Sequence, residues 1–121
     1  MITLAGVYEV TFPVEDLDRA ERFYVDVLGL EVGLRDEPRR WSFLRVGGDG
    51  GMVVLQETPP PWPVRHFALE VADDDLDGAV AALREAGVEI TDPIVHDWMP
   101  ARSAYFADPD GHDLELCAPR R

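Results

Sequence analysis

The sequence has little cysteine, few basic residues and no long hydrophobic run, and each shortage excludes a class of protein. Cys117 is the only cysteine among 121 residues, so no internal disulfide can form. No stretch approaches the ~18 consecutive apolar residues that a membrane-spanning helix needs. The opening segment MITLAGVYEV also lacks the pattern of a secretory signal. We therefore expect a cytoplasmic protein with no membrane partner.

The shortage of basic residues gives the chain a strong negative charge. Lys and Arg total 11 against 24 Asp and Glu, for a formal net charge of -13 at pH 7. Such a surface repels phosphate backbones, which excludes nucleic acid as a partner and favours a neutral or cationic small molecule. With 46% hydrophobic and 29% charged residues, the composition is that of a globular protein, and we expect one domain over residues 1–121.

The first half of the chain predicts a strand, a helix and three further strands, in that order. Alternating apolar residues indicate the strands, and apolar residues at helical spacing in EDLDRAERFYVDVLG indicate the helix. Asp16 suits the N-cap of this helix and Gly29 its C-terminal end. The strands are predicted at residues 5–13, 30–34, 41–46 and 52–57.

The second half repeats this order after the proline-rich linker TPPPWPV. A helix is predicted in DDLDGAVAALREAG, ending at Gly87, with strands at residues 66–71, 88–90, 103–107 and 113–118. Three matches link the halves in sequence order: Glu9 with His66, Gly29 with Gly87, and Trp41 with Arg102. We therefore predict an α+β fold of two βαβββ modules, about 1–58 and 65–121, joined by a linker at about 59–64.

Three stretches carry a resemblance to a known family: FPVEDLDRAERFYVDVLGLEV, the strand that begins at His66, and AYFADPDGHDLELCAP. They resemble the vicinal oxygen chelate superfamily, which includes glyoxalase I, bleomycin-resistance proteins, fosfomycin-resistance transferases, methylmalonyl-CoA epimerase and extradiol dioxygenases. The resemblance covers nearly the whole chain. It implies curled mixed sheets around a cavity, helices on the outside, and a homodimer. It does not specify an activity, because one scaffold carries many chemistries.

Strand alternation divides each predicted strand into a helix-facing and an open-facing set of side chains. In the first strand the helix-facing set is Tyr8, Val10, Phe12 and Val14. Glu9 and His66 then occupy equivalent positions on the open faces of the two modules. In the last strand, Glu115 and Cys117 also face the open side.

The family resemblance implies metal ligands on the first and last strands of each module. Carried over to this chain, those positions are Glu9, His66 and Glu115, whereas the fourth position is Val54. Gln56 lies one pleat further on, and could replace it as a weak fourth ligand only if the GGDGG turn shifts the strand register.

One imidazole and two carboxylates suit Mn²⁺, Mg²⁺, Zn²⁺ or Ni²⁺ better than Fe²⁺, which disfavours a dioxygenase. We expect a metal-dependent, glyoxalase-like enzyme of the lyase, isomerase or oxygenase type, in which a small molecule chelates the ion through vicinal oxygens. The resemblance suggests Glu9 or Glu115 as the catalytic base. These three ligand-type residues at three family positions favour this interpretation over the alternative.

The alternative is a metal-free protein resembling bleomycin-resistance proteins, which binds and sequesters a small drug or metabolite. The acidic charge, which favours a cationic ligand, and the missing fourth metal ligand fit it. In both interpretations some side chains would wall an apolar pocket, although each could equally belong to the core or a dimer contact. The candidates are Thr11, Phe43, Trp62, Trp98, Met99, Tyr105 and Cys117.

The remaining polar motifs are assigned structural roles or none. Asp108, Pro109 and Gly111 have the residue preferences of a type I turn. We expect His112, just after the turn, to be solvent-exposed. His96 lies in IVHDWMP, which we expect to be irregular, and Cys117 has no basic neighbour in sequence that would activate its thiol.

Overall fold

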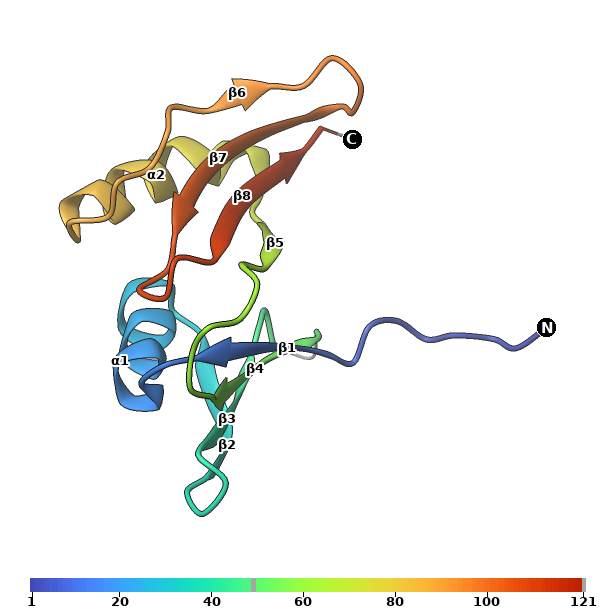
Figure 1. Ribbon diagram of the computed structural model, residues 1–121. Helices are drawn as coiled ribbons and strands as arrows, with labels where there is room; N and C mark the ends of the chain where they lie inside the picture. The colour runs from blue at the N-terminus through green and yellow to red at the C-terminus, as the bar shows by residue number, and fades with distance from the viewer. Residues whose placement is uncertain (49, 121) are drawn as a thin grey trace. The chain divides into compact units, whose positions relative to one another are not determined.

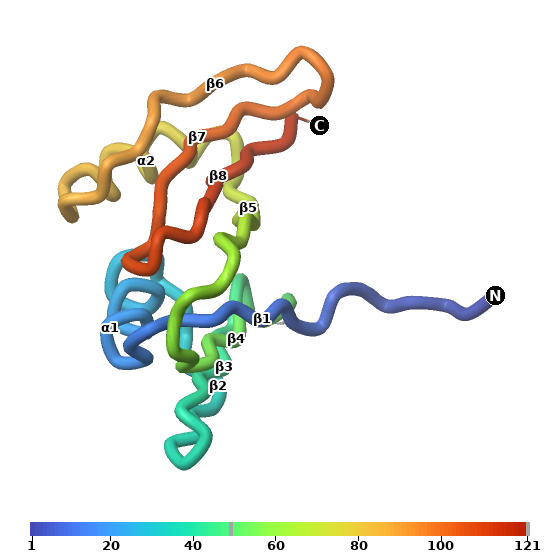
Figure 2. The backbone as a smooth tube through the Cα atoms, in the orientation of Figure 1, coloured from blue at the N-terminus to red at the C-terminus, as the bar shows by residue number. Residues whose placement is uncertain are grey.

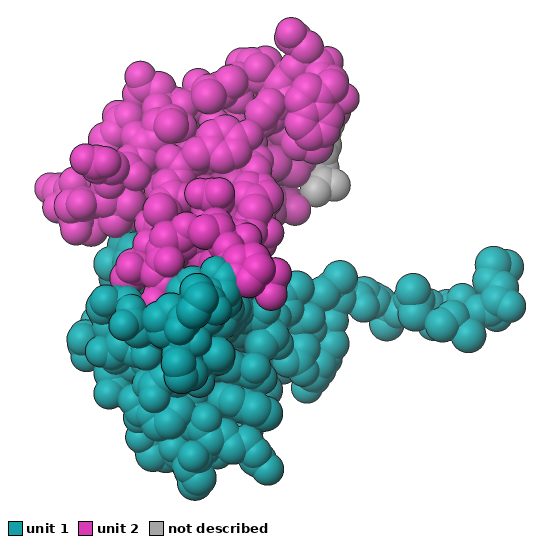
Figure 3. All heavy atoms as spheres, viewed as in Figure 1, with its two compact units in different colours: residues 1–62 teal, residues 63–121 magenta. Residues whose placement is uncertain are grey.

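A computed structural model describes residues 1–48 and 50–120 of the chain. Asp49, part of the predicted GGDGG turn, and the final Arg121 lie outside the described residues. The chain divides into two compact units, Met1–Trp62 and Pro63–Arg121 (Figure 3). This division falls within the linker predicted at 59–64. Each unit contains a four-stranded mixed sheet and a helix, which confirms the predicted α+β class (Figure 1).

Unit 1 follows the predicted order of one strand, one helical segment and three strands. Its sheet has the strand order β1-β4-β3-β2, in which β1 is parallel to β4 and the other pairs are antiparallel. The elements are β1 (Glu9–Val14), α1 (Leu17–Arg22), the π-helical turn η1 (Phe23–Val27), β2 (Glu31–Asp36), β3 (Trp41–Arg45) and β4 (Met52–Glu57).

The helical segment of unit 1 begins and ends as the sequence predicts. Asp16 Oδ1 accepts a hydrogen bond from the backbone N–H of Arg19 at 3.1 Å, which confirms the N-cap. Gly29 ends the segment with φ of 79°, in the left-handed region that favours glycine. Leu17, Ala20 and Tyr24 are fully buried and form the helical side of the core.

Unit 2 repeats this topology with the strand order β5-β8-β7-β6. Strand β5 is parallel to β8, and β7 is antiparallel to both of its neighbours. Helix α2 buries Leu76, Val80 and Leu83. The elements are β5 (His66–Glu70), the 3-10 turn η2 (Asp73–Asp75), α2 (Leu76–Glu85), β6 (Ile94–Val95), β7 (Ala101–Ala107) and β8 (Asp113–Pro119).

The strand predicted at 88–90 is wrong. Ile90 makes only an isolated bridge to Phe106, and the edge strand β6 lies at Ile94–Val95, within a stretch expected to be irregular. Pro93 interrupts the ladder between the two sites because proline has no N–H to donate. Strand β7 begins two residues earlier than predicted, at Ala101. Its antiparallel pairing with β6 places Arg102 opposite Val95.

The predicted helix-facing set of the first strand is also partly wrong. Phe12 and Val14 are buried, but Val10 is 41% and Tyr8 is 76% exposed. Helix α1 lies beside the C-terminal end of β1 (Figure 1), so the start of the strand has no helix over it. Residues 1–8 extend from β1 as an arm with no regular secondary structure (Figure 2), and Tyr8 is the last residue of that arm.

The turn before β8 forms as predicted, but the prediction that His112 is solvent-exposed is wrong. The backbone N–H of Gly111 donates to the carbonyl oxygen of Asp108 at 3.0 Å, the hydrogen bond of a β-turn. His112 is fully buried, and its Nδ1 accepts from the backbone N–H of Arg65 at 2.9 Å. Local sequence could not show this burial, because the partner lies 47 residues away.

Candidate functional site

His66 and Glu115 come together on the open face of the sheet in unit 2. In the parallel ladder His66 is paired with Asp113, and Ala68 with Glu115. The side chains of His66 and Glu115 are therefore diagonal neighbours on one face of the sheet. His66 Nε2 lies 3.3 Å from Glu115 Oε1. The His66 side chain is 53% exposed and that of Glu115 only 10%, so the pair has one solvated and one buried member.

The tautomer of His66 is defined by its second nitrogen. Nδ1 lies 3.1 Å from the carbonyl oxygen of Asp113, and since a carbonyl can only accept, Nδ1 must donate. A neutral His66 therefore carries its lone pair on Nε2, the nitrogen that lies 3.3 Å from Glu115 Oε1. A proton on Nε2 or a metal ion bound by both atoms would make this contact favourable.

Ser103 holds the other oxygen of Glu115. Its hydroxyl donates to Glu115 Oε2 at 2.6 Å, and both residues are buried. Sequence reasoning missed Ser103, because it aligned Trp41 with Arg102. In the structure Trp41 is paired with Gln56, and Ser103 is paired with Cys117. Because Gln56 and Cys117 are equivalent positions, two residues after Val54 and Glu115, Trp41 corresponds to Ser103. Because side chains alternate, an offset of one residue pairs positions on opposite faces of the sheets.

Tyr105 and Cys117 share this face with Glu115. Tyr105 is the direct cross-strand partner of Glu115 in β7, and its hydroxyl lies 3.1 Å from His96 Nε2. The Trp98 ring, 77% exposed, lies against His96 with ring centroids 5.3 Å apart. His96 therefore has a defined place beside Tyr105 that its irregular sequence context did not indicate. Cys117 and Met99 are half-buried.

In unit 1 the equivalent face is apolar at its centre. Val54 is paired with both Thr11 and Phe43, and it takes the position that Glu115 has in unit 2. Glu9 and Thr11 are exposed at the edge strand. The ladder runs without a shift from Met52 to Gln56, so the condition under which Gln56 would replace the missing ligand is not met.

Two of the three predicted metal ligands, His66 and Glu115, are therefore adjacent. The third, Glu9, belongs to unit 1. Within residues 1–48 and 50–120 no group of three or more His, Cys, Asp or Glu side chains is arranged to hold a metal ion. The three-ligand set stays a prediction, whereas the His66–Glu115 pair is a feature of the structure.

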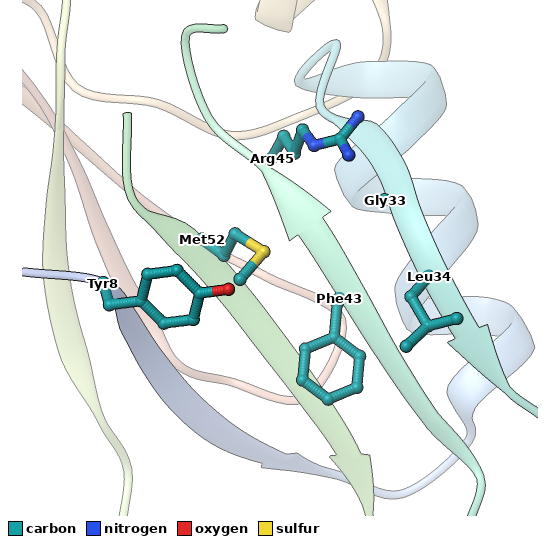
Figure 4. A pocket seen from close by; sticks show the side chains of 6 residues that line it. All are labelled: Tyr8, Gly33, Leu34, Phe43, Arg45 and Met52. Atoms are coloured by element: carbon teal, nitrogen blue, oxygen red, sulfur yellow. The ribbon is translucent and has the colours of Figure 1, made fainter. Parts of the chain in front are cut away.

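Of the remaining pocket candidates, Phe43 lines a cavity of about 250 Å³ in unit 1 (Figure 4). The other residues that line this cavity lie on β2, β3, β4 and the N-terminal arm, and the sequence analysis did not identify them. Trp62 has a structural role in the linker, where its Nε1 donates to the carbonyl oxygen of Thr58 at 3.1 Å. The cavity is lined by Tyr8, Gly33, Leu34, Phe43, Arg45 and Met52.

No helix in the described part of the chain has the length and apolar character needed to cross a membrane.

Comparison with known proteins places this fold and these strands in a family. Residues 6–116 match the model of the Glyoxalase/Bleomycin resistance protein/Dioxygenase superfamily. The chain is 26% identical over 117 residues to metallothiol transferase FosB of Staphylococcus epidermidis, covering 93% of this chain and 83% of that protein.

Two solved structures are also similar. The integron cassette protein HFX_CASS4, from the mobile metagenome of Halifax Harbour Sewage Outfall, has a TM-score of 0.91 and 43% identity, covering 95% of this chain and 99% of that one. TnmS3, an antibiotic binding protein from a Streptomyces species, has a TM-score of 0.84 and 30% identity, covering 99% and 100%. The chain therefore belongs to the Glyoxalase/Bleomycin resistance protein/Dioxygenase superfamily.

Proposed function

We propose that this protein is a metal-dependent, glyoxalase-like enzyme that acts on a small molecule able to chelate a divalent ion through vicinal oxygens. The observation that carries the proposal is the His66–Glu115 pair, in which Nε2 and a carboxylate oxygen, two atoms able to bind a metal ion, lie 3.3 Å apart. The similarity to a protein named metallothiol transferase supports a metal in this family member.

The donor atoms of the pair fit a divalent ion. Two ligand atoms that each lie about 2.1 Å from an ion, at a tetrahedral angle, are about 3.4 Å apart, close to the observed separation. His66 also donates its other nitrogen to a backbone carbonyl, the usual second contact of a metal-binding histidine. With Glu9 as third ligand, the set would hold Mn²⁺, Mg²⁺, Zn²⁺ or Ni²⁺, and Fe²⁺ less well.

When bound, such an ion would supply Lewis acidity that stabilises negative charge on a substrate oxygen. The chain's own residues would divide the remaining work. Ser103 fixes Glu115 Oε2 and leaves Oε1 directed at His66. Glu115 is thereby held in one orientation, so the exposed Glu9 is the better candidate for the base that accepts a proton from the substrate.

A second candidate function is metal-free binding of a small molecule. The protein named as antibiotic binding aligns with 99% of this chain at 30% identity, and unit 1 has a small cavity of its own. In this interpretation the contact between His66 and Glu115 has a structural role, so no metal is needed.

Metal analysis separates the two functions. Protein purified without a metal-affinity column is analysed by inductively coupled plasma mass spectrometry, as wild type and as His66→Ala, Glu115→Ala and His96→Ala. We expect near-stoichiometric metal in the wild type, loss in the first two variants, and retention in His96→Ala, which removes an imidazole outside the ligand set. A wild type that carries no metal, and takes up none on titration, would refute the enzyme proposal and leave the binding function.

A further inference from the structure

The cavity in unit 1 has apolar walls and one strong cation. Figure 4 shows Tyr8, Met52 and Phe43 arranged around it, Leu34 at the β2 side, and Arg45 at the end beside Gly33. Its volume of about 250 Å³ is below the roughly 300–1,000 Å³ typical of drug-sized ligands, so it suits a compound of one or two rings. A neighbouring cavity of about 260 Å³ shares Tyr8, Arg45 and Met52 with it.

Arg45 differs from the other arginines of the β2–β3 region. Arg35 and Arg40 each bind several carboxylates, and Arg39 binds Asp36. In contrast, no carboxylate of the described residues lies within 4.0 Å of the Arg45 guanidinium. Its N–H groups, which form a planar fork suited to carboxylates, have no hydrogen-bond partner among residues 1–48 and 50–120.

Gly33 lies beside the Arg45 side chain. Strand β2 has a register irregularity between Val32 and Leu34, and Gly33 lies at that point. A Cβ built on Gly33 would stand 3.3 Å from the backbone oxygen of Phe43, 3.4 Å from Arg45 Nε and 3.5 Å from its Cγ. A side chain larger than alanine at position 33 would therefore compete for the space over β2 in which Arg45 lies (Figure 4).

Two acidic residues oppose an anion at this place, and their effect is limited. Glu31 is the ladder partner of Arg45, and Glu9 is paired with Met52, so both lie on the same face. Both are exposed, and solvent and salt screen their repulsion. The net charge of the chain favours a cationic ligand, but Arg45 is the only formally charged side chain that lines this cavity within the described residues.

We propose that this cavity binds a small aromatic carboxylate, with its ring against Phe43, Leu34 and Met52 and its carboxylate on Arg45. The inference goes beyond the proposed metal-dependent function, because no metal ligand lines the cavity. It also differs from the cationic ligand that the net charge alone predicts.

The test compares two probes that share a naphthalene ring and carry either a charged or a neutral polar group. Isothermal titration calorimetry in the presence of a chelator measures binding of 2-naphthoate and of the neutral 2-naphthalenemethanol. We expect the wild type to bind the carboxylate about three- to tenfold more tightly, the range for a charge-assisted contact that is partly solvated. The amide chemical shifts of Leu34, Phe43 and Met52, and the methyl chemical shifts of Leu34 and Met52, should move with both probes.

Two variants identify the source of the preference. Arg45→Met should bind both probes equally, and its retained affinity for the alcohol would show an intact cavity. Arg22→Met, which removes the same charge from an exposed position on α1, should keep the wild-type preference. The proposal is overturned if neither probe shifts the cavity residues, if the wild type does not prefer the carboxylate, or if Arg45→Met keeps the preference. Because a chelator is present, these outcomes do not depend on the metal site.

Discussion

Replacing Ser103 by alanine tests whether Glu115 is held in place by the hydrogen bond seen in the structure. The hydroxyl of Ser103 donates to Glu115 Oε2 at 2.6 Å, and both residues lie in the interior of unit 2. Ser103→Ala would remove the hydrogen-bond donor of this carboxylate oxygen. Water could replace it only poorly, because Glu115 is only 8% exposed. Removing one partner of a buried, charge-assisted hydrogen bond costs about 1.5–3 kcal/mol.

Ser42→Ala is a matched control in unit 1. Ser42 is as buried as Ser103 and donates to Glu21 Oε2 at 2.8 Å, but that oxygen also binds Arg35 at 2.8 Å. Glu21 therefore keeps a charged partner after the substitution. We expect a cost of about 0.5–1.5 kcal/mol, the value of an ordinary hydrogen bond.

The free energy of unfolding of both variants is measured by urea titration, with metal affinity as a second readout. Ser103→Ala should lose more stability than Ser42→Ala. If Glu115 is a metal ligand, Ser103→Ala should also lower metal affinity about 10- to 100-fold, as expected for a residue that orients a ligand. Equal losses of stability in the two variants, with unchanged metal affinity in Ser103→Ala, would refute the positioning role of Ser103.

Two further predictions concern stability. Arg40, followed by the backbone N–H of Leu17, lowers the pKa of Glu57 below its ordinary value of 4.5, so this carboxylate stabilises the fold above that pH and the contribution is lost as pH falls through the folded pKa. The melting temperature, measured between pH 7 and 3, should therefore fall less steeply below about pH 4.5 for Glu57→Gln than for the wild type. Gly29→Ala, at φ of 79°, should cost about 1 kcal/mol in urea titrations. Gly78→Ala, in helix α2 where an added Cβ would meet open space, should increase the free energy of unfolding by about 0.5–1 kcal/mol. A change of the same sign in both glycine variants would contradict this.

Local sequence patterns were sufficient to predict most of the fold. The N-cap at Asp16 and the helix end at Gly29 each depend only on residues a few positions away, and both form as predicted. Alternation also placed His66 and Glu115 on one face of their sheet. The prediction of a strand at 88–90 failed because three residues, of which only Val88 and Ile90 are apolar, carry little information, and Pro93 then displaced the edge pairing to Ile94–Val95.

Contacts between distant residues were not accessible in the same way. The burial of His112 depends on a hydrogen bond to Arg65, and the role of Ser103 depends on the register between β7 and β8. Matching the two halves by residue type aligned Trp41 with Arg102, one position away from Ser103, which the strand registers make its equivalent. Because side chains alternate with period two, an offset of one residue pairs positions on opposite faces, so the match did not bring Ser103 and Glu115 together.

The two units share one topology but carry different side chains at corresponding ladder positions. Val54 and Phe43 occupy in unit 1 the places of Glu115 and Tyr105 in unit 2. The open face of unit 1 is thereby suited to hold a ring, whereas that of unit 2 carries hydrogen-bonding and ionisable groups. This division means that variants of Phe43 and Arg45 should alter ligand affinity, and variants of His66 and Ser103 should alter metal binding, each with little effect on the other property.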